Sequence, residues 1–129
     1  MIVKTSRQNT GKAGEDEACR YLRGLGHTIL ARNWRRFHLE LDIISLYMEE
    51  LHIVEVKSRT APVAADPSVN VNGSKRKRLA RAANAFINSV EMFALPKNLD
   101  VFFDIITVVF GKEGATVEYY PEAFIPIYE

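Results

Sequence analysis

Two carboxylates and an ammonium group interrupt apolar stretches in the first half of the chain. Asp42 stands in the stretch LELDII, and Glu55 and Lys57 stand in the stretch LHIVEVK. Alternate side chains of a strand share one face, so Glu55 and Lys57 are expected to point to the same side. Carboxylates beside an ammonium group can bind a divalent cation and stabilise the charge that develops in phosphodiester cleavage.

The segment between these two stretches predicts that the carboxylates meet. A two-residue turn at positions 48 and 49 would place Asp42 directly opposite Glu55. Opposed residues have Cβ atoms about 4.5–5.5 Å apart. Two carboxylates that close repel each other unless one is protonated or a cation lies between them. Mg²⁺ can be held by one or two carboxylates, so this register predicts a Mg²⁺ or Mn²⁺ site beside Lys57.

A purely structural interpretation competes with this one. Charged residues are common on edge strands, and the unit Glu-x-Lys occurs by chance in most proteins. What favours a functional site is an acidic residue inside an apolar strand, Asp42, at the position that the turn brings opposite Glu55.

Hydrophobic periodicity predicts the elements that would position these residues. Two amphipathic helices are expected at residues 11–25 and 75–94, the second with Ser74 as its N-cap and with Val90 and Phe93 on its apolar stripe. Strands are expected at residues 28–33, 39–46, 51–57, 101–110 and 115–120, and a long loop at residues 58–74. The order αβββαββ predicts a mixed sheet flanked by helices, in the α/β class.

The motif formed by Asp42 and the unit Glu55-Val56-Lys57 resembles the PD-(D/E)xK motif of restriction-endonuclease-like nucleases. The wider pattern is similar to the YraN-like family, an uncharacterised bacterial group of nuclease-like proteins related to archaeal Holliday-junction resolvases. The matching segments, in order, are GKAGE at 11–15, Ala18, Tyr21-Leu22, Gly26, ARNWR at 31–35, ELDII at 40–44, VEVKSR at 54–59, Lys75, Leu79 and FDI at 103–105.

The resemblance implies a restriction-endonuclease-like fold and a role for each site residue. Asp42, Glu55 and the Val56 carbonyl would hold the metal, and Lys57 would stabilise the attacking water or the transition state. Glu15, on the helical stripe expected to face the sheet, would add to the metal site or orient a water. For Glu15 the alternative is a first-turn carboxylate stabilised by the helix dipole.

Charge is distributed unevenly along the chain and predicts an anionic partner. Residues 1–81 hold 15 Lys and Arg and 9 Asp and Glu, whereas residues 82–129 hold 2 and 7. Nucleic acid, and DNA first, is the expected partner of the basic half, with a solvated charged surface as the alternative. The residues expected to contact it are Lys75, Arg76, Arg78, Arg35 and Arg59.

Two further residues have two interpretations each. Trp34, among Arg32, Arg35 and Arg36, can stack on a base or belong to the core. Asp104 interrupts an apolar strand, and we expect it to be a buried hydrogen-bonded or ion-paired residue rather than a metal ligand.

Composition excludes several classes of protein. With 129 residues, 47% hydrophobic and 26% charged, the chain is expected to form a single domain over residues 1–129 rather than a disordered or fibrous protein. No apolar run approaches the roughly 20 residues that span a bilayer, and the first residues do not resemble a signal peptide. One cysteine, Cys19, is compatible with the cytoplasm, and the three histidines lack zinc-ligand spacing.

The leading hypothesis is therefore a metal-dependent endonuclease that hydrolyses phosphodiester bonds in DNA, with branched or damaged DNA as candidate substrates. A homodimer is compatible with the sequence. The first alternative is a non-catalytic nucleic-acid-binding module on a nuclease fold. The second is an interaction protein whose acidic C-terminal half would cover a partner with four aromatic residues, Tyr119, Tyr120, Phe124 and Tyr128.

Overall fold

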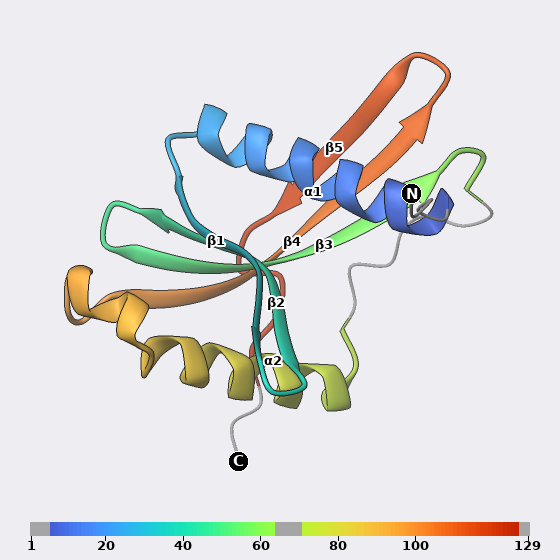
Figure 1. Ribbon diagram of the computed structural model, residues 1–129. Coiled ribbons are helices and arrows are strands. Elements are labelled where there is room, and N and C mark those ends of the chain that lie inside the picture. The colour runs from blue at the N-terminus through green and yellow to red at the C-terminus, as the bar shows by residue number, and fades with distance from the viewer. Residues whose placement is uncertain (1–5, 64–70, 127–129) are drawn as a thin grey trace, which may run out of the picture.

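A computed structural model of the protein describes residues 6–63 and 71–126, so residues 64–70 of the predicted loop at 58–74 lie outside the described residues. A five-stranded sheet lies between two helices (Figure 1). The elements are α1 (Ser6–Gly24), β1 (Thr28–Arg36), β2 (Leu39–Tyr47), β3 (Glu50–Thr60), α2 (Gly73–Ile87), the 3₁₀ helix η1 (Val90–Ala94), β4 (Asp100–Gly111) and β5 (Gly114–Tyr120). The predicted order αβββαββ and the α/β class are confirmed.

The strands lie side by side in the order in which they occur in the sequence. Neighbours are antiparallel except for β3 and β4, which are parallel and therefore need a crossover that contains α2 and η1. Strands β2 and β3 pair from Ile43 with Val54 to Tyr47 with Glu50. This is the register that a two-residue turn at positions 48 and 49 predicts.

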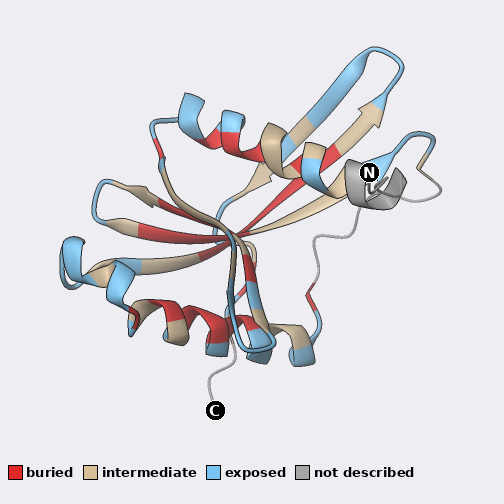
Figure 2. Cartoon of the chain, in the orientation of Figure 1, coloured by how far each residue is buried: buried red, intermediate tan, exposed pale blue. Residues whose placement is uncertain are grey.

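Each helix buries one side against its own face of the sheet (Figure 2). On the α1 face the fully buried residues are Ala18, Cys19, Leu22, Ile43, Val54, Ile106 and Val108. On the α2 face the buried residues include Leu41, Ile44, Leu51, Ile53, Leu79, Ala83, Phe86, Phe103 and Ile105. Burial of each large aliphatic or aromatic side chain contributes roughly 1.5–3 kcal/mol, so these two clusters hold both helices against the strands.

Helix α2 is shorter than its sequence pattern predicts. It ends at Ile87, because Asn88 and Ser89 hydrogen-bond back to the carbonyls of the last helical turn. Such side chains compete with the helical hydrogen bonds of the backbone. The predicted continuation to residue 94 is therefore wrong, and Val90 and Phe93 are exposed on η1 rather than packed on the sheet. None of the described helices is long and apolar enough to cross a membrane.

Candidate active site

Asp42 lies where the pairing of β2 with β3 ends. The register would bring Asp42 opposite Glu55, but the last pair of the ladder is Ile43 with Val54. Beyond this pair the Asp42 carboxylate provides the link between the strands, because its Oδ2 accepts a hydrogen bond from the Val56 N–H at 2.9 Å. The predicted pair of Asp42 with Glu55 is therefore not part of the ladder: the strands separate there, and a carboxylate side chain, rather than a backbone carbonyl, joins them.

Strand β2 also changes faces at this point. Leu41 and Ile44 both pack in the cluster on the α2 face, although they are three positions apart, whereas Ile43 packs on the α1 face. Strict alternation would put Leu41 and Ile44 on opposite faces, so the strand is irregular between them. Asp42 occupies the irregularity and lines a hollow on each side of the sheet.

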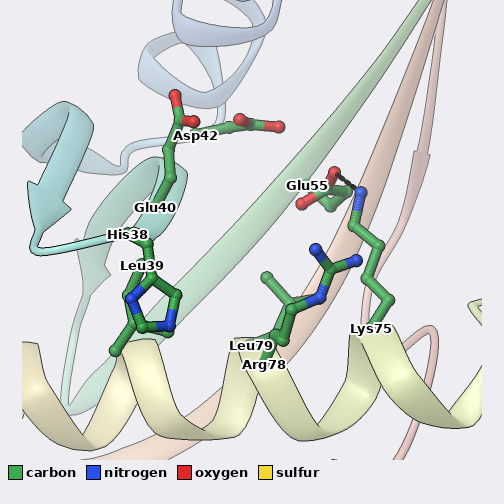
Figure 3. A pocket seen from close by; sticks show the side chains of 8 residues that line it. All are labelled: His38, Leu39, Glu40, Asp42, Glu55, Lys75, Arg78 and Leu79. Carbon is green, nitrogen blue, oxygen red and sulfur yellow. Dashed lines mark ion pairs between the residues drawn. The ribbon is translucent and has the colours of Figure 1, made fainter.

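Two hollows meet at Asp42. The hollow on the α2 face, of about 190 Å³, is shown in Figure 3 and is lined by His38, Leu39, Glu40, Asp42, Glu55, Lys75, Arg78 and Leu79. The hollow on the α1 side, of about 690 Å³, is lined by Thr10, Gly11, Glu15, Asp42, Val56, Ser58, Arg59 and Thr60. All three predicted carboxylates, Glu15, Asp42 and Glu55, therefore line one of these hollows, and Asp42 lines both.

Lys75, in the first turn of α2, forms an ion pair with Glu55. Asn72 caps the helix by accepting a hydrogen bond from the Lys75 N–H at 2.9 Å, so the predicted Ser74 cap is wrong. The Lys75 side chain extends toward β3, where its Nζ lies 2.6 Å from the Glu55 Oε1 (Figure 3). Glu55 is mostly buried, and a short charge-assisted contact of this kind is among the stronger hydrogen bonds. Lys75, expected to contact nucleic acid, is thus part of the carboxylate site.

Lys57 belongs to the same group of charges. It follows Glu55 by two positions along β3 and therefore shares its face. Partial burial lowers the pKa of the Lys57 ammonium, and the charge of Lys75 lowers it further, while Glu55 opposes the shift. Two ammonium groups consequently stand close to one buried carboxylate.

Asp42, in contrast, lies in surroundings that disfavour its negative charge. Burial is the main cause that raises the pKa of Asp42 to about 7, and the negative charges of Glu55 and Glu15 add to it. The Val56 N–H and the Lys75 ammonium lower the pKa, but they do not compensate. A carboxylate in this state is half protonated at neutral pH, and a divalent cation would restore its charge.

Glu15 reaches the site because α1 approaches β3 closely. A Cβ atom at Gly14 would lie 1.8 Å from the Ser58 Oγ, so only glycine permits this approach. The Glu15 Oε1 accepts a hydrogen bond from the Asn33 side chain at 2.9 Å and lies 3.7 Å from the Arg32 guanidinium. Asn33 and Ser58 were not predicted as parts of this site. The residue type of Asn33 was the available signal, because asparagine tolerates a positive φ better than most residues and Asn33 has a φ of 50°.

The donor set fits a hard cation with few protein ligands. Among the residues that the structure describes, no three His, Cys, Asp or Glu side chains gather into a metal-binding group. Asp42 and Glu55 remain, and Mg²⁺ is commonly held by one or two carboxylates and several waters, for which the hollow on the α2 face has room. Zinc, which takes at least three protein ligands, does not fit. The Val56 carbonyl stays a predicted ligand.

The predicted basic residues fall into two groups. Arg78 lines the hollow on the α2 face and Arg59 lines the hollow on the α1 side. Arg76 instead donates to the Val71 carbonyl at 2.7 Å, and Arg35 lies 3.3 Å from Glu40 on the surface. Arg78, Arg59 and Lys75 are therefore placed at the candidate site.

Several aromatic residues pack against the core, with Trp34 and Tyr119 partly buried. Trp34 packs edge-to-face on Phe86, with ring centroids 5.5 Å apart, so the core interpretation holds. Phe124 packs on Phe103, and the Tyr119 hydroxyl donates to Asp104 at 2.5 Å. Asp104 is fully buried and hydrogen-bonded, as predicted. The aromatic surface expected in the C-terminal half is reduced accordingly, and Tyr128 lies outside the described residues.

Comparison with known sequences supports the resemblance to the YraN-like family. A "UPF0102 protein" of Bacteroides thetaiotaomicron is 41% identical over 116 residues, which are 90% of this chain and 92% of that protein. Two further UPF0102 proteins, from Bacteroides fragilis and Nitratidesulfovibrio vulgaris, are 44% and 38% identical and also cover 90% or more of this chain, with 92% and 86% of their own lengths matched. The model of the uncharacterised protein family UPF0102 matches residues 14–108. The chain therefore belongs to this family, UPF0102, which is the YraN-like family.

Proposed function

We propose that this protein is a Mg²⁺- or Mn²⁺-dependent nuclease that hydrolyses phosphodiester bonds in DNA. The observation that supports it most is that the largely buried carboxylates of Asp42 and Glu55 lie with Lys57 and Lys75 where two strands separate. Acids with strongly raised pKa values in a cleft are typical of functional sites. The αβββαββ order and the resemblance to the PD-(D/E)xK motif agree with this function.

Each residue has a role in the proposed reaction. Asp42 and Glu55, with the Val56 carbonyl, would hold the cation. A bound Mg²⁺ polarises a phosphate and lowers the pKa of a bound water. Lys57 would stabilise the negative charge of the attacking water or of the pentavalent phosphate, and Glu15, from the α1 side, would orient the water. Lys75 would release Glu55 when the cation binds and would then face a DNA phosphate.

Cleavage and metal affinity test this proposal. Branched, nicked and single-stranded DNA would be incubated with Mg²⁺ or Mn²⁺, and we expect cleavage that EDTA abolishes. Glu55→Gln should weaken Mn²⁺ binding in calorimetry far more than it weakens DNA binding in EDTA, because it removes the charge of a ligand and little else. The matched control is Glu49→Gln, the same change in the exposed turn between β2 and β3. Equal Mn²⁺ affinities in the wild type and in both variants would contradict the proposal.

Salt dependence tests the DNA interface separately. If about five basic side chains neutralise phosphates, the logarithm of the association constant should fall with a slope of about −4.5 against the logarithm of salt concentration. A flat dependence would exclude DNA as the partner of the basic residues.

One observation favours a non-catalytic alternative. The Lys75 ammonium already neutralises Glu55 at 2.6 Å, and a binding module could use this ion pair in place of a metal. Such a module would bind DNA equally well in EDTA and would cleave none of the substrates with either metal.

A further inference from the structure

An uncovered aromatic ring stands on the turn between β1 and β2. Phe37 is 89% exposed and has a φ of 58°, in the left-handed region. This conformation is unfavourable for a bulky side chain, and the exposed ring gains nothing from the core. Neither the packing nor the backbone of the fold therefore accounts for a phenylalanine at this position.

The turn borders the candidate active site. His38, the second residue of the turn, lines the hollow that Asp42 and Glu55 also line (Figure 3). In Figure 1 the turn extends down across α2, the helix that supplies Lys75. Phe37 is thus one residue away from the wall of the hollow that holds the two proposed metal ligands.

Two arginines belong to the turn and to the hollow that it borders. Arg36, which precedes Phe37, is exposed, and Arg78 of α2 lines the same hollow as His38. Exposed aromatic rings beside basic residues are the arrangement with which proteins bind unpaired nucleotides, since the ring stacks on a base while the cations meet the backbone.

The shape of the substrate follows from the stacking. The bases of a continuous duplex cover one another, so a protruding ring can stack only on a base that is unpaired, flipped or at a junction. Trp34 cannot serve this purpose, because it is packed on Phe86. Phe93, another ring that is largely exposed, lines a separate apolar hollow with Leu51 and Val101.

We infer that Phe37 stacks on an unpaired base next to the phosphate that would be cleaved at the proposed site of Asp42 and Glu55, so that the preferred substrate is DNA with a single-stranded or branched segment at that point. The inference rests on the proposed function for the identity of the ligand. It adds a binding position for a base and a class of DNA that the metal site alone does not select.

Binding without divalent ions tests this inference. Fluorescence anisotropy in EDTA would compare a labelled splayed-arm DNA with a duplex of the same length. Phe37→Ala should weaken binding of the splayed-arm DNA on the order of tenfold and should leave duplex binding unchanged. Phe37→Trp should retain the affinity of the wild type, and Phe37→Leu should not, because leucine is apolar but cannot stack in the same way.

Met48→Ala is the matched control. Met48 stands on the other two-residue turn of β2, at the opposite end of the strand, with a φ of 53° and 78% exposure. Met48→Ala should change neither the affinity for splayed-arm DNA nor the affinity for duplex DNA. A 2-aminopurine at the unpaired position should change its fluorescence on binding to the wild type and to Met48→Ala, but not on binding to Phe37→Ala.

The outcomes separate this inference from the proposed function. Equal loss of both DNA affinities in Phe37→Ala, or no loss, would overturn the inference even if the wild type cleaves DNA. If Phe37→Ala selectively loses splayed-arm binding and the wild type cleaves no DNA, the stacking position would be supported and the nuclease function would be refuted.

Discussion

Asp42 and Asp104 both interrupt apolar strands, and the structure treats them in opposite ways. Asp104 accepts three hydrogen bonds, from the His52 Nδ1 and the Tyr119 hydroxyl at 2.5 Å each and from the Glu122 N–H at 2.9 Å. A single such bond, from the Val56 N–H, is described for Asp42, which faces two hollows. A buried acid whose donors are all supplied by the fold has no capacity left for a ligand, whereas Asp42 keeps that capacity.

The charged neighbours of the two acids differ as well. Burial lowers the pKa of His52, but its hydrogen bonds and attraction to Asp104 and Glu50 outweigh this and raise the pKa overall, so the surroundings of Asp104 favour a positive charge on its neighbour. Asp42 instead faces the carboxylates of Glu55 and Glu15. The comparison teaches that donors and neighbouring charges, rather than the type of residue, distinguish a structural acid from an acid that can take a ligand.

The largest expected effect is on the stability of the Asp104 cluster. Asp104→Ala should lower the free energy of unfolding by about 3–5 kcal/mol, because it leaves the His52 ring, the Tyr119 hydroxyl and the Glu122 N–H without their common acceptor. Urea denaturation measures the change, and Asp104→Asn, which keeps an acceptor, should cost less. A loss below about 1 kcal/mol would remove the distinction between the two acids.

On the side of Asp42 the largest expected effect is on rate. Lys57→Ala should reduce cleavage about 10²–10³-fold, since a preorganised charge is lost at the transition state. Mn²⁺ affinity should persist or rise, because a competing cation has left the carboxylates. Lys112→Ala, in the exposed turn between β4 and β5, is the control for the loss of one positive charge. A folded Lys57→Ala variant with full activity would make Lys57 an ion-pair partner only.

Asp42→Asn tests the raised pKa through stability. With a pKa of about 7, folded Asp42 holds a proton that the unfolded chain releases near pH 4. The stability of the metal-free protein should therefore fall as pH rises between about 4 and 7, and Asp42→Asn should abolish this fall and gain on the order of 2–4 kcal/mol at pH 8. Unfolding curves of the wild type and of Asp42→Asn at pH 5 and 8 measure this difference in stability. Mg²⁺ should stabilise the wild type at pH 8 and not the variant, and identical pH profiles would contradict the shift.

The smallest expected effect comes from Glu15→Gln. Glutamine still accepts from Asn33, so the fold should be unchanged, but one negative charge beside Asp42 disappears. The pKa of Asp42 should then fall by on the order of half a unit, which a carbon-detected NMR titration can resolve. An unchanged titration would mean that Glu15 does not act on Asp42, and a rise would contradict the placement of the two acids.

Features that depend on neighbouring residues along the chain were predictable from the sequence. The parity of a two-residue turn sets the β2–β3 register, and the periods of 2 and 3.6 set the order of strands and helices. These local rules brought Asp42, Glu55 and Lys57 into one region. They also indicated that Asp104 is buried and hydrogen-bonded, because an acid inside a wholly apolar strand must find partners.

Only the tertiary structure decided which partners these residues meet. The ion pair between Lys75 and Glu55 and the approach of Gly14 to Ser58 join segments more than 15 residues apart, and local periodicity does not determine such contacts. The two hollows at Asp42 exist because two helices cover the two faces of the sheet and leave its opening strands uncovered. The choice of Trp34 for the core and Phe37 for the surface follows from the same packing, since the face that α2 covers buries one ring and the turn beyond that face exposes the other.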